Sequence, residues 1–356
     1  MNNLLTKEFA SEKIIADQNK LLDILSNRRV ESVICKTNQL HIYSYWTLIN
    51  QISEQKIMLG FSGKNGWEEF PIGEIAFDDL MKFVGFNKEL VLKFIQENIG
   101  SIWEPINQWL SKRPISEEVK LVTSFGTDGN RYIKGITSPK YLLIPDEQVI
   151  DLFLKNERNK SREPLVFSHA HLNESSSEFV FLTQRDKEFV ERKEVGSIVQ
   201  TGIKIINSEG TRKSCVEFAS YLYRLICSNG ATGAVPGLRD NKIHVGKNFI
   251  LSNMIDSMLI NNERLLDGID RMYLPVDHAY MHEKIVPEVF DSLENILGKK
   301  ESIELQEQKN HLDWMVPGDA WNFITAYAKY QSREKRISLE RYATQFILNY
   351  SGIRLN

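Results

Sequence analysis

Cysteine is scarce in this sequence, and long apolar runs are missing. The 356 residues include three cysteines, Cys35, Cys215 and Cys227, without any C-x-x-C pair, so the sequence indicates neither a disulfide framework nor a thiolate zinc site. No stretch approaches the roughly 20 apolar residues that span a bilayer, and charges interrupt the apolar residues of the N-terminus, unlike those of a signal peptide. We therefore expect a cytoplasmic protein in a reducing compartment, without membrane association.

The sequence also lacks a strong excess of charge of one sign. Its formal net charge is −3, with 42% hydrophobic and 26% charged residues. This balance excludes a strongly basic nucleic-acid binder and a heavily acidic mimic of DNA. The composition is close to the globular average, and the length suits two ordinary domains or one large one.

Hydrophobic spacing in the N-terminal third indicates helices and a few strands. The apolar residues of 7–28 predict one amphipathic helix, and residues 73–99 predict two short helices separated at Gly85, followed by a third around 103–110. The β-branched and aromatic segments VESVICKT and HIYSYWTLI predict strands, although the second could begin a helix.

Short apolar runs broken by turn residues predict an antiparallel sheet in the middle third. Asp128-Gly129 between two apolar runs indicates a hairpin, and Pro145 opens a predicted helix with acidic residues in its first turn. We interpret SCVEFASYLYRLIC as a strand leading into a short helix and SNGATGAVPGLRDNK as a glycine-rich loop. From Asn248 onward the spacing is helical.

These patterns predict an α+β fold, with a mainly antiparallel core followed by a helical C-terminal region. We expect three regions. They are an N-terminal α/β region with a helical hairpin (1–118), a β-rich core with a basic glycine-rich loop (119–250) and a helical region (251–356).

A local excess of basic residues lies in the span 196–250, which has seven Lys or Arg and three Asp or Glu. Such an excess is common on a solvated face, but it also suits a surface that binds phosphates. Aromatic side chains beside these cations would add base stacking. The candidate nucleic-acid-binding residues are Lys204, Arg212, Lys213, Tyr223, Arg224, Arg239, Lys242, His244 and Lys247.

Two pairs of histidines have a spacing that can hold zinc. His169 and His171 would share one face of a strand, and His278 and His282 one face of a helix. Nothing in the sequence brings the pairs together, and Glu283 follows the second helical histidine instead of lying between the two as in H-E-x-x-H. Surface or capping histidines are the favoured interpretation, so we predict no metal.

No catalytic motif accompanies these residues. The glycines of 230–237 lack the Gly-Lys-Ser/Thr ending of a P-loop, and Pro236 removes a backbone amide that a phosphate nest would need. No G-x-S-x-G surrounds a serine. The polar runs 207–209 and 228–230 are typical of turns and caps. We therefore predict neither catalysis nor a cofactor.

Five segments in order carry a family resemblance. They are PIGEIAFDDLMKFVGFNKELVLKFI, GITSPKYLLIPDEQVIDLF, TGIKIINSEGTRKSCVEFASYLYRLICSNGATG, KIHVG and GDAWNFITAYAKY. Over about residues 67–345 the chain resembles the phage- and plasmid-borne family of unknown function numbered nine-three-two. It departs from the family where Gly210 follows Asn-Ser-Glu directly and where Ala326 replaces a glutamate.

The resemblance implies a mobile-element context and, loosely, a likeness to single-strand annealing recombinases of the RecT and Red-beta kind. Annealing needs a basic groove, aromatic stacking and usually a ring or filament of subunits. One hypothesis is therefore a non-catalytic, homo-oligomeric protein that binds single-stranded DNA. The alternative is a phage or plasmid protein that binds and modulates a host or defence protein.

Overall fold

The computed structural model describes most of the chain. The described residues are 5, 13–49, 52–63, 66–97, 101–126, 129–161, 163–183, 187–188, 198–210, 215–224, 231–243, 251–268, 278–308, 314, 316–328 and 330–351. None of the helices within these ranges is long and apolar enough to cross a bilayer.

The N-terminal lobe contains two three-stranded antiparallel sheets around one hydrophobic core. The first sheet has the order β2-β6-β7 and the second the order β3-β4-β5, and both pack against helices α2–α4 through residues such as Phe61, Phe77 and Leu121. The elements are β2 (Glu31–Lys36), η1 (Thr37–Gln39), β3 (His41–Ile49), β4 (Ile52–Gly63), β5 (Gly66–Pro71), α2 (Glu74–Val84), α3 (Lys88–Gln96), α4 (Trp103–Ser111), β6 (Glu118–Phe125) and β7 (Arg131–Thr137).

The three helices of this lobe confirm the predicted breaks. Helix α2 ends at Gly85, whose φ of 77° is a left-handed conformation that glycine adopts without strain. The side chain of Asn87 then accepts a hydrogen bond from the backbone N–H of Leu90 and caps α3.

A larger sheet forms the centre of the molecule. Its strand order is β1-β8-β9-β11-β12-β13, with β10 paired to β11, and every strand pair in the three sheets is antiparallel, which confirms the predicted α+β class. The elements are β1 (Lys13–Ile15), α1 (Gln18–Arg28), α5 (Asp146–Lys160), β8 (Leu165–Leu172), β9 (Ser177–Thr183), β10 (Lys187–Glu188), β11 (Ile198–Asn207), β12 (Cys215–Arg224) and β13 (Ala231–Ile243).

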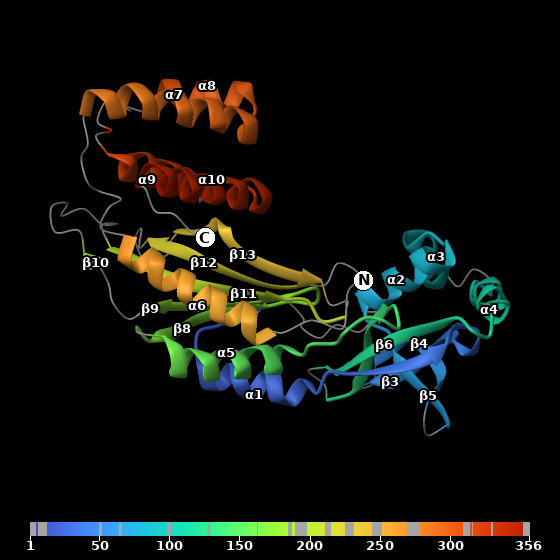
Figure 1. Ribbon diagram of the computed structural model, residues 1–356. Coiled ribbons are helices and arrows are strands. Elements are labelled where there is room, and N and C mark those ends of the chain that lie inside the picture. The colour runs from blue at the N-terminus through green and yellow to red at the C-terminus, as the bar shows by residue number, and fades with distance from the viewer. Residues whose placement is uncertain are drawn as a thin grey trace.

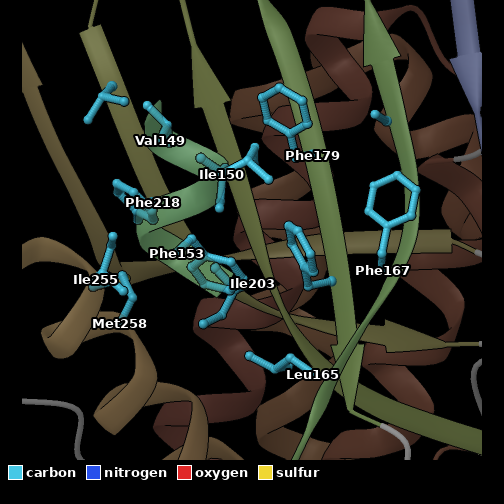
Figure 2. Packing of buried hydrophobic residues seen from close by; sticks show 14 of the residues in the cluster. Val149, Ile150, Phe153, Leu165, Phe167, Phe179, Ile203, Phe218, Ile255 and Met258 are labelled. Carbon is cyan, nitrogen blue, oxygen red and sulfur yellow. The ribbon is translucent and has the colours of Figure 1, made fainter. Parts of the chain in front are cut away.

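Helices cover both faces of this sheet (Figure 1). Helices α1, α5 and α6 cover one face, where alternate residues such as Phe179, Ile203 and Phe218 form a close-packed core (Figure 2). Helices α9 and α10 lie over the other face, with α7 and α8 beyond them, and Val180 joins their core. The C-terminal helices are α6 (Leu251–Gly268), α7 (His278–Leu297), α8 (Lys299–Gln308), α9 (Pro317–Ala328) and α10 (Arg333–Ser351).

Two expectations about local structure are wrong. Residues 13–28 form strand β1 and then helix α1 instead of one helix, because Lys13–Ile15 pairs with β8 and Asp17 caps α1. The expected glycine-rich loop is strand β13, which pairs with β12 at the end of the sheet. A register shift between Ala219 and Tyr221 accommodates the segment with Pro236, as edge strands and bulges do.

The hydrophobic clusters cross the ranges expected from the sequence. Strands β6 and β7 belong to the N-terminal core, although they follow residue 118 in the chain. Conversely, Ile15, Leu21 and Leu25 belong to the core of the central sheet. The chain therefore passes between lobe and central sheet more than once.

The two parts meet where the backbone of Gly135 in β7 touches that of Gly210, just after β11. A β-carbon on Gly135 would overlap the carbonyl oxygen of Gly210. Because backbone cannot move aside as a flexible side chain can, only glycine fits here.

Replacing Gly135 by alanine should therefore lower the free energy of unfolding by about 3 kcal/mol, as overpacking does in close-packed sites. The matched control is Gly63→Ala in β4, where the added methyl would meet only the flexible end of Glu68. Urea unfolding followed by circular dichroism measures both. Equal effects of the two substitutions would contradict the proposed close approach.

Candidate nucleic-acid interface

The predicted basic residues fall into two groups. Arg212, Lys213, His244 and Lys247 lie outside the described residues. The others lie on the three adjacent strands β11, β12 and β13; they are Lys204, Tyr223, Arg224, Arg239 and Lys242.

The strand ladder gives the backbone positions of these residues. Lys204 pairs with Ala219, which pairs with Arg239, and Lys242 pairs with Val216. Among the five, only the side chain of Lys204 belongs to the described part of the chain. The expectation of one basic track therefore stays a prediction.

Lys204 is engaged in a structural ion pair. Its ammonium lies 3.0 Å from the carboxylate of Glu178 on the neighbouring strand, and its side chain is 18% exposed. Glu340 of α10 lies close enough that the charge of Lys204 lowers its pKa, although burial dominates and raises that pKa to about 7. Glu178 therefore already neutralises this lysine, which disfavours Lys204 as a phosphate contact.

The histidines whose side chains the structure describes are not grouped with other metal-ligating side chains. The rings of His169 and His171 lie 5.1 Å apart on β8, and burial, followed by the charge of His171, lowers the pKa of His169. His282 lies on α7, while the side chain of His278 is outside the described part of the chain. Among the described residues no three His, Cys, Asp or Glu side chains are grouped as metal ligands.

The run Asn207-Ser208-Glu209, predicted to form a turn and a cap, makes its contacts with segments far away in the chain. The amide of Asn207 donates to the carbonyl of Ile144 at 2.9 Å and to the carboxylate of Asp146 at 2.7 Å. Ser208 contributes its carbonyl, which accepts from the hydroxyl of Tyr141. The segment thus connects the end of β11 to the start of α5.

Glu209 is the centre of a buried ionic cluster. Its carboxylate lies 2.6 Å from Arg28 and 2.9 Å from Lys134, and accepts the backbone N–H of Asp146 at 2.6 Å. It therefore caps α5 at the end where the helix dipole favours an anion. Arg28 also binds Asp146 at 2.7 Å, so two cations balance two carboxylates.

The surroundings of Asp146 act on its pKa in opposite directions. Burial raises the pKa most, and the charge of Glu209 raises it further, whereas Arg28, Lys134 and the hydrogen bond from Ser177 lower it. Beside the cluster lies a cavity of about 240 Å³. Arg29, at the end of α1 with a left-handed φ of 43°, contributes to its wall. The charged groups here pair with one another, which indicates a structural role.

A row of aromatic side chains, missed in the sequence, lies on one face of the sheet β3-β4-β5. His41, Tyr43 and Tyr45 alternate along β3, with ring centroids 6.0 and 6.4 Å apart. Trp67 of β5 lies on the same face of the sheet. It pairs with Ser62 of β4, which is two residues from Gly60, and Gly60 is the partner of His41. We call the face formed by these four residues the aromatic face.

The aromatic face is open to solvent. Trp67 is 55% exposed and Tyr45 41% exposed. The opposite face of the same sheet packs into the lobe, where Asn107 of α4 exchanges two hydrogen bonds of 2.8 Å with the backbone of Ile42. Because the opposite face is held against the lobe, the rings of the aromatic face point to solvent.

Gly60 explains how the Trp67 ring is placed. A β-carbon on Gly60, in the central strand β4, would overlap this indole ring. The ring therefore lies directly on the backbone of the central strand, with part of its surface exposed. The sequence signal was present in His41-Ile-Tyr-Ser-Tyr45, in which every second residue is aromatic, but alternation alone does not say which face is buried.

Comparison with family models, curated proteins and solved structures finds no match. The resemblance to the phage and plasmid family therefore stays a prediction.

The ionic cluster predicts a contrast between two neighbouring residues. Replacing Glu209 by glutamine should lower the free energy of unfolding by about 3 kcal/mol or more, because it leaves two buried cations without their shared anion. Ser208→Ala should change it by less than about 0.5 kcal/mol, since Ser208 contributes its backbone carbonyl. Thermal and denaturant unfolding measure both; a larger loss in the serine variant would restore the local-cap interpretation.

Proposed function

We propose that this protein binds single-stranded nucleic acid, with unstacked bases lying on the aromatic face of β3-β4-β5. The observation that carries the proposal is the exposure of Tyr45 and Trp67 on an ordered sheet beside His41 and Tyr43. Aromatic rings held on a sheet bind successive bases of a single strand, because every base has a planar face.

The composition of this face is unusual for a solvated sheet. An antiparallel sheet with one buried face normally places polar residues on the other. Here the second face carries two tyrosines, a histidine and a tryptophan. Exposing the apolar surface of each ring to water is unfavourable in free energy, and a polar residue would avoid this. A ligand that covers the rings would remove that apolar surface from water.

The exposed rings favour a single strand over a duplex, and two further features suit a nucleic-acid strand. The rings lie on a broad sheet surface, whereas the bases of a duplex are already stacked on one another and cannot lie flat on a protein ring. Lys56 lies opposite Tyr45 in the ladder and supplies a cation for a phosphate next to a stacked base. The sheet lies at the far end of the molecule from α7 and α8 (Figure 1), which leaves room for a strand.

A protein partner is the second candidate. Aromatic surfaces also bind proline-rich segments, which enter as preformed polyproline II helices. The low net charge of the aromatic face suits a proline-rich segment, because such a segment carries no row of phosphates that cations must balance. We favour nucleic acid because the row of rings along β3 offers repeated stacking positions for a repeating ligand.

Removing two rings should test the proposal directly. The double variant Tyr45→Ala/Trp67→Ala should weaken binding of a 20-nucleotide single strand by at least about tenfold at low salt, since each stacked base contributes about 1–3 kcal/mol. Fluorescence anisotropy with a labelled strand measures the affinity. The control is Tyr330→Ala, which removes a tyrosine that is 81% exposed but lies between α9 and α10.

Three outcomes are informative. An equal loss in the double variant and the control would contradict base stacking on the aromatic face. An absence of binding by the wild-type protein at low salt would overturn nucleic-acid binding altogether. Binding of a proline-rich peptide that the double variant abolishes would identify a protein partner instead.

The contribution of the basic residues of β13 to binding can be tested separately. If Arg239 and Lys242 contact phosphates in addition, the variant Arg239→Ala/Lys242→Ala should weaken binding of all sequences alike. It should also reduce the slope of log affinity against log salt by about one unit for each lost contact. An unchanged slope would confine the phosphate contacts to other residues.

A further inference from the structure

Glu69 places a carboxylate on the aromatic face. It lies on β5 opposite Gly60, two residues from Trp67 and therefore on the same face of the sheet. Its Oε2 atom accepts a hydrogen bond of 2.5 Å from the hydroxyl of Tyr43 across the sheet. The side chain is exposed, so its second oxygen can accept from a ligand on the rings.

An exposed carboxylate is an unexpected group within a surface for a polyanion. It repels phosphates, and Tyr43 would stack equally well without it. A carboxylate can, however, only accept hydrogen bonds, and it distinguishes bases by the donors on their edges. Cytosine and adenine carry an exocyclic amino group, whereas thymine presents carbonyl acceptors at the corresponding position.

We infer that Glu69 is a specificity-determining residue, which favours bases with an exocyclic amino group over thymine or uracil. The inference rests on the proposed binding of single strands by the aromatic face. A base lying on the rings of Tyr43 and Trp67 has its edge near Glu69, because Glu69 comes from the strand of Trp67 and bonds to Tyr43. An amino group there donates to the carboxylate, while a carbonyl oxygen is repelled.

The tyrosine keeps the carboxylate in place. Burial, together with the hydrogen bond to Glu69, raises the pKa of Tyr43 well above its ordinary value. The hydroxyl therefore stays protonated and continues to donate at any pH used for binding. Tyr43 thus has two functions: it stacks a base and it holds the acceptor that reads the edge of that base.

The test compares two pyrimidine strands that stack alike and differ in this donor. Wild-type protein should bind 20-nucleotide oligo(dC) more tightly than oligo(dT) by about threefold or more, the range of one partly exposed hydrogen bond. Glu69→Gln should bring the ratio close to one, because the amide can donate to thymine as well as accept from cytosine. Fluorescence anisotropy at one fixed salt concentration measures all four affinities.

The matched control is Glu68→Gln. Glu68 is the adjacent carboxylate, but the alternation of the strand places it on the opposite face of the sheet. This control changes the net charge as Glu69→Gln does and should retain the preference for oligo(dC). A second variant, Tyr43→Phe, keeps the stacking ring and releases Glu69, so the ratio of oligo(dC) to oligo(dT) affinity should fall towards one.

Each result decides between the two proposals. Equal binding of oligo(dC) and oligo(dT) by the wild-type protein, or a preference that survives Glu69→Gln, overturns the role of Glu69 and leaves single-strand binding intact. If neither strand binds, the proposed function itself fails. If Glu68→Gln abolishes the preference as well, net charge and not base recognition explains the difference.

Discussion

Four buried charges join the N-terminal lobe to the central sheet. Arg28 comes from α1, Lys134 from the lobe, Asp146 from the start of α5 and Glu209 from the end of β11. Taking these groups out of water is costly, so the arrangement depends on each charge meeting its partner. Such a cluster adds little to the free energy of unfolding, but it disfavours any other packing of the lobe on the sheet, because that packing would leave a buried charge without its partner. Next to Lys134 and Glu209 in the chain, the backbones of Gly135 and Gly210 touch, so the lobe and the central sheet also meet closely at this place.

The packing of helices on the sheets decides which sheet faces remain open to solvent. The central sheet is covered by helices on both faces, and its polar side chains, such as Lys204 and Glu178, neutralise one another there. The sheet β3-β4-β5 has only one face in a hydrophobic core. The aromatic face is consequently presented to solvent on a rigid support, as a recognition surface requires.

Local patterns were sufficient for most helices and strands of the fold. Gly85 and Asn87 separate α2 from α3 through their own backbone and cap chemistry, and Pro145 opens α5 in the same way. Patterns failed where a distant partner decides the outcome. Strand β13 contains Gly and Pro, which indicate a loop, but β12 supplies the hydrogen bonds that make it an edge strand. Glu209 belonged to an expected turn, yet its partners are far away in the chain.

The candidate site shows the same limit. The alternation of aromatic residues from His41 to Tyr45 and the excess of basic residues in 196–250 are both present in the sequence, and neither pattern says which residues are exposed. The sequence by itself determined the α+β class, the helical C-terminal region and the positions of most strands, because hydrophobic spacing and turn chemistry act over a few residues. Only the tertiary structure decided which face of each sheet is buried. Packing between distant segments paired Lys204 with an acid and left Tyr45 and Trp67 in water.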